Sequence, residues 1–193
     1  MKEIIFATNN QHKLEEIRNI TEGKLLIRSL HDLGFYEDIP ETENSIEGNA
    51  VLKAAAVFKR FQLPCFADDT GLEVNALDGA PGVYSARYAG ENASYADNVA
   101  KLLKAMEHQS DRKARFKTVI AYIDNHTQRL FEGIIEGNIS TKALGNNGFG
   151  YDPVFVPDGF DISFAEMDAA TKNALSHRAI ASRKLSEWLL TLD

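Results

Sequence analysis

The sequence predicts a mixed α/β fold in which helices flank a mixed β-sheet. Apolar, strand-like segments alternate with helical segments in the first third of the chain, and two strand-like segments joined by a short polar turn follow later. Strands linked by helices favour parallel pairing, whereas a hairpin is antiparallel, so we expect both kinds of pairing in one sheet. The order of elements indicates a single domain over residues 1–193, with two lobes around a central cleft.

The N-terminal region predicts a strand, a polar turn and a helix. Residues 4–7 are all apolar and predict a buried strand, and residues 8–10 offer side chains that cap a helix. Leu14 and Ile17 then recur at helical spacing, while Glu16 faces outward.

A second strand, an acidic loop, a buried helix and a third strand follow. The helix is apolar on more than one side, so we expect it to be buried on more than one side. The third strand ends at Asp68 and Asp69, and Thr70 and Gly71 then form a turn. The four elements cover residues 25–27, 31–48, 49–61 and 63–67.

The second half of the chain predicts a break in regular secondary structure, then a helix, a hairpin, a glycine-rich loop and a last helix. Ser94, followed three residues later by Asp97, has the spacing of a helix start. The β-branched and aromatic content of the two strand segments supports the hairpin. In order, the break covers residues 78–82, the hairpin strands 114–123 and 128–140, the loop 145–150, and the last helix begins near Ser176.

Composition restricts the classes of function. The net charge of −7 makes a broad basic surface for a nucleic-acid polymer unexpected, although a few cations can converge on a small anion. Cys65 is the only cysteine, which excludes an intramolecular disulfide and fits a small core residue in a reducing compartment. With no long apolar span in the sequence, we expect no membrane partner and a cytoplasmic location.

Asp68 and Asp69 are the most informative residues of the chain. Two neighbouring carboxylates raise one another's pKa, and burial raises the pKa of both. Mg²⁺ relieves that cost because it prefers carboxylate oxygens. A solvated turn is the alternative, since Asp, Thr and Gly all favour turns.

Two lysines suit a phosphate chain. The turn before the first helix exposes backbone N–H groups at the positive end of the helix dipole, and Lys13 adds a charge there. The alternative is an ordinary Asn-capped helix with an exposed lysine. Lys53 lies in a largely apolar helix, where it needs an anionic partner or, alternatively, a path along which its side chain reaches water.

A third group of residues suits a nucleoside. Phe149 lies between two glycines, where its ring can stack on a base or, alternatively, pack on the core. Further donors come from Lys172 and from the segment Ser176, His177 and Arg178. The alternative for His177 and Arg178 is a surface position, because a His-Arg pair at a helix start is often only a surface feature. Carboxylates for a metal, three separated lysines and a planar-base site together indicate a nucleoside triphosphate with Mg²⁺.

The chain resembles the inosine triphosphate pyrophosphatase family, also called non-canonical purine nucleoside triphosphate pyrophosphatases or house-cleaning nucleotide hydrolases. The resemblance runs in order over nearly the whole chain. It departs from many relatives at Asn9, where they have glycine. It also departs at Glu47-Gly48, since many relatives have an acid directly before the asparagine that corresponds to Asn49. The matching segments are residues 8–13 (TNNQHK), 49–54 (NAVLKA), 67–72 (ADDTGL), 79–87 (GAPGVYSAR), 148–153 (GFGYDP) and 176–178 (SHR).

The resemblance implies an elongated fold, a homodimer, and Mg²⁺-dependent cleavage of ITP, dITP or XTP to the monophosphate and pyrophosphate. It implies that Asp69 is the catalytic carboxylate and a metal ligand, with Asp68 and Glu41 as further ligands; Glu43 and Glu47 are alternatives to Glu41. The implied substrate-binding residues are Thr8, Asn9, Asn10, Gln11, His12, Lys13, Lys53, Thr70, Phe149, Gly150, Tyr151, Asp152, Lys172, His177 and Arg178.

Two other functions stay open from the sequence. One is a related pyrophosphatase of the Maf type, which prefers modified pyrimidines or methylated bases. The other is a module that binds nucleotides without turnover, which the number of acidic residues disfavours.

Overall fold

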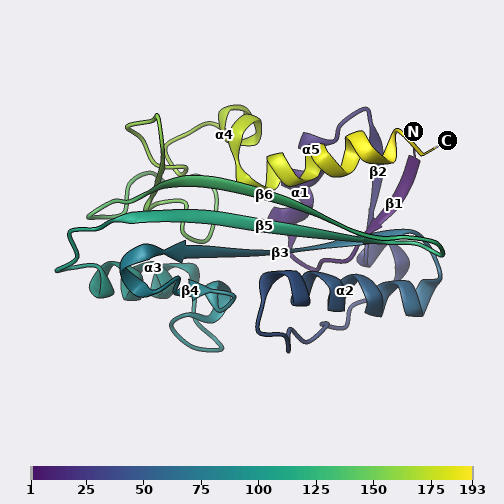
Figure 1. The fold of residues 1–193 in the computed structure, drawn as a ribbon, viewed down its shortest axis with the longest axis horizontal. Coiled ribbons are helices and arrows are strands. Elements are labelled where there is room, and N and C mark those ends of the chain that lie inside the picture. Colours follow the sequence, from purple (N-terminus) through teal and green to yellow (C-terminus); the bar gives the residue numbers. More distant parts are fainter. Residues whose placement is uncertain (1, 193) are drawn as a thin grey trace. The chain divides into compact units, whose positions relative to one another are not determined.

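The structure is a computed structural model that describes residues 2–192 (Figure 1). Helices and strands alternate as predicted early in the chain, and the long hairpin follows. The strands are β1 Lys2–Phe6, β2 Leu25–Ser29, β3 Cys65–Val74, β4 Pro81–Gly82, β5 Lys113–Ile123, β6 Gln128–Ile139 and β7 Phe155–Pro157. The α-helices are α1 Gln11–Ile20, α2 Ile46–Phe61, α3 Tyr95–Ala105, α4 Ala169–Leu175 and α5 His177–Leu189, with short 3-10 helices at His31–Leu33, Asn75–Leu77 and Ser85–Arg87.

The strands form one mixed sheet in the order β2-β1-β3-β5-β6-β7, with β4 paired to β3. β1 pairs in parallel with β2 and with β3, whereas β3–β4 and β6–β7 are antiparallel. The predicted mixed α/β fold is therefore confirmed. None of the helices within residues 2–192 has the length and apolar character needed to cross a membrane.

The chain divides into two compact units. Unit 1 comprises residues 1–69, 118–133 and 177–193, and unit 2 comprises residues 70–117 and 134–176. The predicted division into two lobes agrees with these units, while a single domain over residues 1–193 stays a prediction.

Unit 1 is a layered core with helices on both faces of the sheet. α1 and α5 cover one face and α2 covers the other (Figure 1). Phe6 and Phe66 stack at 4.6 Å between their ring centroids within this core. α5 approaches β6 so closely that a Cβ atom added at Gly133 would lie 2.0 Å from the carbonyl oxygen of His177. Only glycine allows this approach, which fixes the start of α5 against the sheet.

Cys65 confirms the prediction of a small core residue. Its side chain is fully buried, and its thiol donates to the carbonyl oxygen of Ala54 in α2 at 3.3 Å. Burial raises the pKa of this thiol to about 12, so it is an unreactive packing group rather than a nucleophile.

Unit 2 has its own core, to which α3 contributes Val99 and Leu102, and to which Met106 at the C-terminal cap of α3 also belongs. The predicted start of α3 is confirmed. The Ser94 hydroxyl accepts from the Asp97 N–H at 3.2 Å, and the Asp97 carboxylate accepts from the Ser94 N–H at 2.8 Å. These two bonds form a capping box, which satisfies two backbone donors at the helix start.

The structure corrects three local predictions. The strand expected to end at the acid pair continues to Val74, with β5 as its neighbour in the sheet and β4 paired to its end at Leu72↔Gly82 and Glu73↔Pro81. Pairing overrides the turn preference of Thr70 and Gly71. The helix α4 was not predicted because it is short and lacks a clear apolar period, and Glu16 points inward rather than outward.

Candidate active site

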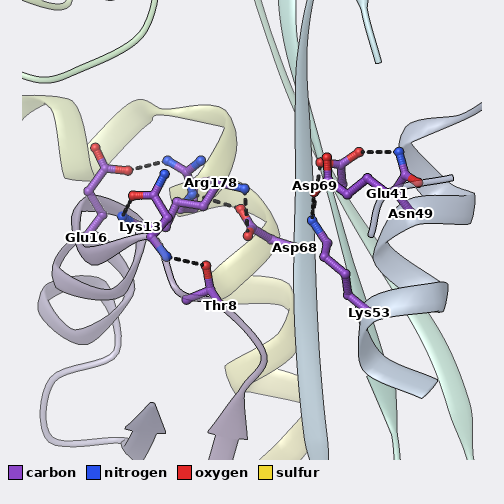
Figure 2. Close-up of polar contacts among 10 residues, drawn as sticks. Thr8, Lys13, Glu16, Glu41, Asn49, Lys53, Asp68, Asp69 and Arg178 are labelled. Carbon is purple, nitrogen blue, oxygen red and sulfur yellow. Dashed lines mark hydrogen bonds and ion pairs between the residues drawn. The ribbon is translucent and has the colours of Figure 1, made fainter. Parts of the chain in front are cut away.

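Strand β3 directs its two neighbouring carboxylates to opposite faces of the sheet. Figure 2 shows Asp68 pointing toward α1 and α5, and Asp69 pointing toward α2. Successive residues of a strand alternate in this way, and both side chains are buried, at 1% and 6% exposure. The two carboxylates therefore make their direct contacts with different cations, and the solvated-turn interpretation is wrong.

Asp68 is held by two cations of unit 1. Lys13 Nζ donates to Asp68 Oδ1 at 3.0 Å, and Arg178 Nε donates to Asp68 Oδ2 at 3.1 Å. Arg178 Nη1 also donates to Glu16 Oε2, so the guanidinium bridges two carboxylates. Burial raises the pKa of Asp68, but the attraction of Lys13 and Arg178 outweighs it and holds the pKa below its ordinary value. The prediction that this carboxyl has a raised pKa is wrong.

Asp69 faces a different set on α2 and the acidic loop. Asp69 Oδ1 accepts from Lys53 Nζ at 3.5 Å, and Asp69 Oδ2 accepts from Asn49 Nδ2 at 3.4 Å. Burial raises the pKa of Asp69 above its ordinary value, and the nearby positive charges of Lys53 and Lys13 only partly offset this. A buried carboxylate with a raised pKa is a stronger base than an exposed one.

Lys53 joins Asp69 to Glu41. Its Nζ donates to Glu41 Oε1 at 2.5 Å, and its side chain is only 11% exposed. Burial lowers the pKa of Lys53, but Asp69 and Glu41 outweigh burial and raise it, which keeps this amine charged. The lysine has two anionic partners, the buried Asp69 and the half-buried Glu41, so the alternative in which it merely reaches water is wrong.

The pair of Glu41 and Asp69 fits a hard cation. Both carboxylates converge on one positive group, the Lys53 ammonium. Within residues 2–192, no three His, Cys, Asp or Glu side chains are grouped to hold a metal by themselves. Mg²⁺ is commonly bound by one or two protein carboxylates together with substrate phosphates, so this donor set suits it. Asp68 directs its oxygens to Lys13 and Arg178 on the other face of the sheet.

The turn before α1 is built from its own polar side chains. Asn10 caps the helix, accepting from the Lys13 N–H at 3.2 Å, and Thr8 Oγ1 accepts from the Asn10 N–H at 3.1 Å. Asn9 Nδ2 donates to Asp38 Oδ1 at 3.1 Å, which links this turn to the acidic loop. Lys13 is 15% exposed and ion-paired, which differs from the exposed lysine of an ordinary capped helix. Gln11 and His12 are exposed.

The predicted nucleoside-binding residues of unit 2 gather around Asp152. Its Oδ2 accepts from Lys172 Nζ at 2.7 Å and from the Phe149 N–H at 2.8 Å. A Cβ atom added at Gly148 would lie 2.0 Å from the same oxygen, and the φ of Gly148 is +74°, so this position requires glycine. Tyr151 is buried, and its hydroxyl donates to the carbonyl oxygen of Ser85 at 2.8 Å.

The remaining predicted residues lie at the ends of their elements or inside a strand. His177 and Arg178 open α5 in unit 1 and are buried, at 3% and 2% exposure. Thr70 is half-buried within β3, and Gly150 follows Phe149 with a φ of +63°.

Sequence reasoning missed two site residues, Asn49 and Glu16. Asn49 is fully buried in the first turn of α2; it donates to Asp69, and its Oδ1 accepts from the Glu43 N–H at 3.0 Å. An asparagine in an otherwise apolar helix face was a usable signal. Glu16 gave no signal, because its partner Arg178 lies 162 residues further along the chain.

The chain belongs to the Ham1 family, whose model matches residues 4–188. This class of protein agrees with the resemblance identified from the sequence motifs. A solved structure of the Staphylococcus aureus Ham1 protein superposes with a TM-score of 0.90 at 38% identity and covers 100% of both chains. A HAM1 protein structure from Coxiella burnetii gives a TM-score of 0.90 at 39% identity, covering 99% of this chain and 100% of that one.

Curated relatives carry the name dITP/XTP pyrophosphatase. The relative from Porphyromonas gingivalis is 59% identical over 191 residues, which is 98% of each chain. The relative from Flavobacterium psychrophilum is 49% identical over 186 residues, covering 96% of this chain and 98% of the relative.

Proposed function

We propose that the protein is a nucleoside triphosphate pyrophosphatase that hydrolyses ITP, dITP and XTP to the monophosphate and pyrophosphate, with Mg²⁺ as cofactor. The names of relatives that match nearly the whole chain support the substrate class. The observation that carries the proposal is the convergence of Glu41 and Asp69 on the Lys53 ammonium. Such an enzyme would remove deaminated purine nucleotides before their incorporation into nucleic acid.

Glu41 and Asp69 would hold the metal. When bound, Mg²⁺ would neutralise negative charge on the phosphate oxygens. Glu41 is favoured over Glu43 because Glu41 contacts Lys53, whereas Glu43 is exposed. Asp68 would orient Lys13 and Arg178, since both cations bind its carboxylate.

Asp69 would also orient the attacking water and accept its proton. Its raised pKa suits a base, and the Asn49 amide fixes one of its oxygens while leaving the carboxylate charge in place. Lys53, Lys13 and the N-terminus of α1 would bind the phosphate chain, because each offers a positive charge or a dipole to a polyanion.

The nucleoside would be bound by Phe149, Asp152, Lys172, His177 and Arg178. A 6-oxo purine presents an acceptor where adenine presents a donor, and Arg178 can only donate. A hydrogen bond from Arg178 to the 6-oxo group would therefore favour ITP over ATP. Adenine would place its amino donor opposite the Arg178 donor and leave buried polar groups without a hydrogen bond.

Homodimer formation and residence in the cytoplasm are further parts of the proposal, supported by the family resemblance alone.

Products of the reaction test the proposed function directly. Incubation with ITP and Mg²⁺ in ¹⁸O-labelled water should yield labelled IMP and unlabelled pyrophosphate, because water would attack the α-phosphorus. Orthophosphate as the first product would contradict the bond assignment. Binding of ITP without products would indicate a sensing module, and turnover of modified pyrimidine triphosphates in preference to ITP would indicate the Maf-type activity.

An Asp69→Asn variant tests the assigned base. Loss of a general base costs about 10²–10⁴-fold in kcat, and loss of a metal ligand would add to this. Asp161→Asn is the matched control, because Asp161 is exposed and lies in unit 2. Circular dichroism should show that both variants are folded. Near-normal turnover in a folded Asp69→Asn variant would exclude Asp69 as the base.

A further inference from the structure

Phe149 is the aromatic residue that the proposed function places against the base, and it lies between two glycines whose backbone conformation other residues rarely adopt. Gly148 and Gly150 flank it, both with positive φ. Contacts with Asp152, Lys172 and Tyr95 restrain the residue within unit 2. Asp152 accepts from its N–H, Lys172 Nζ lies 5.0 Å from its ring centroid, and the Tyr95 ring lies 5.9 Å away at an interplanar angle of 46°.

Tyr95 is well placed to restrain that ring. It is the first residue of α3, directly after the Ser94 cap, so the capping box fixes its backbone. Its side chain is 43% exposed, so core packing does not account for a large aromatic residue there. A tilted ring pair at this separation is an attractive aromatic contact.

We propose that Tyr95 is a positioning residue that holds the Phe149 ring ready to stack on the substrate base. This inference rests on the proposed function of Phe149. The contact is made between the rings of Tyr95 and Phe149, so a phenylalanine at position 95 would keep it. Holding the ring in advance reduces the conformational entropy that base binding must otherwise remove, which strengthens binding of the nucleoside part of the substrate.

The test compares Tyr95→Ala, Tyr95→Phe and Phe149→Ala in the full-length protein. Tyr95→Ala should raise the KM for ITP and the Kd for IMP by about 3–10-fold, the range expected for one aromatic pair, with kcat nearly unchanged. Tyr95→Phe should behave like the wild type, because it keeps the ring. Inhibition by pyrophosphate, which lacks a base, should be the same in all variants.

Tyr84→Ala is the matched control. Tyr84 is also exposed, at 50%, lies in unit 2, and its ring contacts Arg87. It should leave both the Kd for IMP and pyrophosphate inhibition unchanged.

The outcomes separate this inference from the proposed function. If Phe149→Ala weakens IMP binding but Tyr95→Ala does not, the positioning role of Tyr95 is wrong while the base contact stands. If Phe149→Ala leaves IMP binding unchanged, the base contact itself is wrong and the role of Tyr95 falls with it. A loss of pyrophosphate inhibition equal to the loss of IMP affinity in Tyr95→Ala would indicate a general structural effect and would also overturn the inference.

Discussion

Lys53 joins two carboxylates that come from different parts of unit 1. Glu41 lies in the acidic loop and Asp69 on β3, and both contact the Lys53 Nζ on α2. The lysine offsets the repulsion that the two acids would otherwise experience at close range. In the proposed function the same ammonium group would also bind a phosphate of the substrate.

Lys53→Met should weaken triphosphate binding. We expect the KM for ITP to rise by at least about tenfold, since a charge-assisted contact contributes roughly 1.5–3 kcal/mol. Lys59→Met is the matched control, because Lys59 lies on the same helix and is exposed. Steady-state kinetics and circular dichroism of both variants measure the effect, and an unchanged KM in folded Lys53→Met would remove Lys53 from the phosphate site.

Asp68→Asn should reduce stability in a pH-dependent way. Because the pKa of Asp68 is lower in the folded chain than the ordinary 3.8, its ionised form stabilises the fold above that value. This contribution is lost as the pH falls below about 4 toward the lowered folded value. The variant removes the carboxylate charge that pairs with Lys13 and leaves Arg178 with Glu16 as a remaining partner. Breaking a buried ion pair typically costs about 3–5 kcal/mol.

Urea unfolding of wild type and Asp68→Asn across the pH range measures this difference. We expect a large gap in unfolding free energy from neutral pH down to about pH 5, and a narrowing gap below about pH 4. Asp161→Asn, on an exposed residue, should show little difference at any pH. A gap that widens in acid would contradict the direction of the Asp68 pKa shift.

At the scale of elements, helix starts position much of the candidate site. Asn10 caps α1 close to Lys13, and Asn49 lies in the first turn of α2. His177 and Arg178 open α5, whose approach to the sheet depends on Gly133. Helix starts expose donors and a positive dipole end, which explains why they suit a polyanionic substrate.

Ser94→Ala should destabilise α3 measurably. Removing a capping serine costs about 0.5–2 kcal/mol, because the backbone N–H of Asp97 loses its acceptor. Thermal unfolding should show a lower Tm than in the wild type. Ser110→Ala, on an exposed residue outside the helices, serves as the control and should leave the Tm nearly unchanged. Equal Tm values for wild type and Ser94→Ala would mean that the capping box does not stabilise the helix in solution.

At the scale of the whole molecule, charge distribution restricts the partners. The net charge of −7 coexists with several cations that the structure holds in ion pairs, such as Lys13, Lys53 and Arg178. A local site for a small anion is compatible with this arrangement, whereas attraction to a long polyanion needs an extended basic surface.

We therefore expect no binding to duplex DNA at about 0.15 M salt, because the net charge of −7 opposes association with a polyanion. An electrophoretic mobility assay with a basic DNA-binding protein as positive control measures this. A retarded band that weakens as salt is raised would contradict the expectation and would indicate a basic patch.

Local patterns in the sequence determined the secondary structure of most of the chain. Apolar runs predicted the strands around residues 4–7 and 25–27, helical spacing predicted α2, and the Ser94–Asp97 pair predicted the start of α3. The motif segments were sufficient to identify the family. These features depend on neighbours within a few residues, so the sequence shows them directly.

Tertiary structure decided which charges meet. β3 continues through Thr70 and Gly71 as a strand of the sheet between β1 and β5, and its extended backbone directs Asp68 and Asp69 to opposite faces. The Arg178 contact with Glu16 joins residues 162 positions apart. No local period specifies such partners, because they are set by strand order and by the face on which each helix packs. The physical reason is that periodicity reports whether a residue is buried, whereas the fold determines what it is buried against.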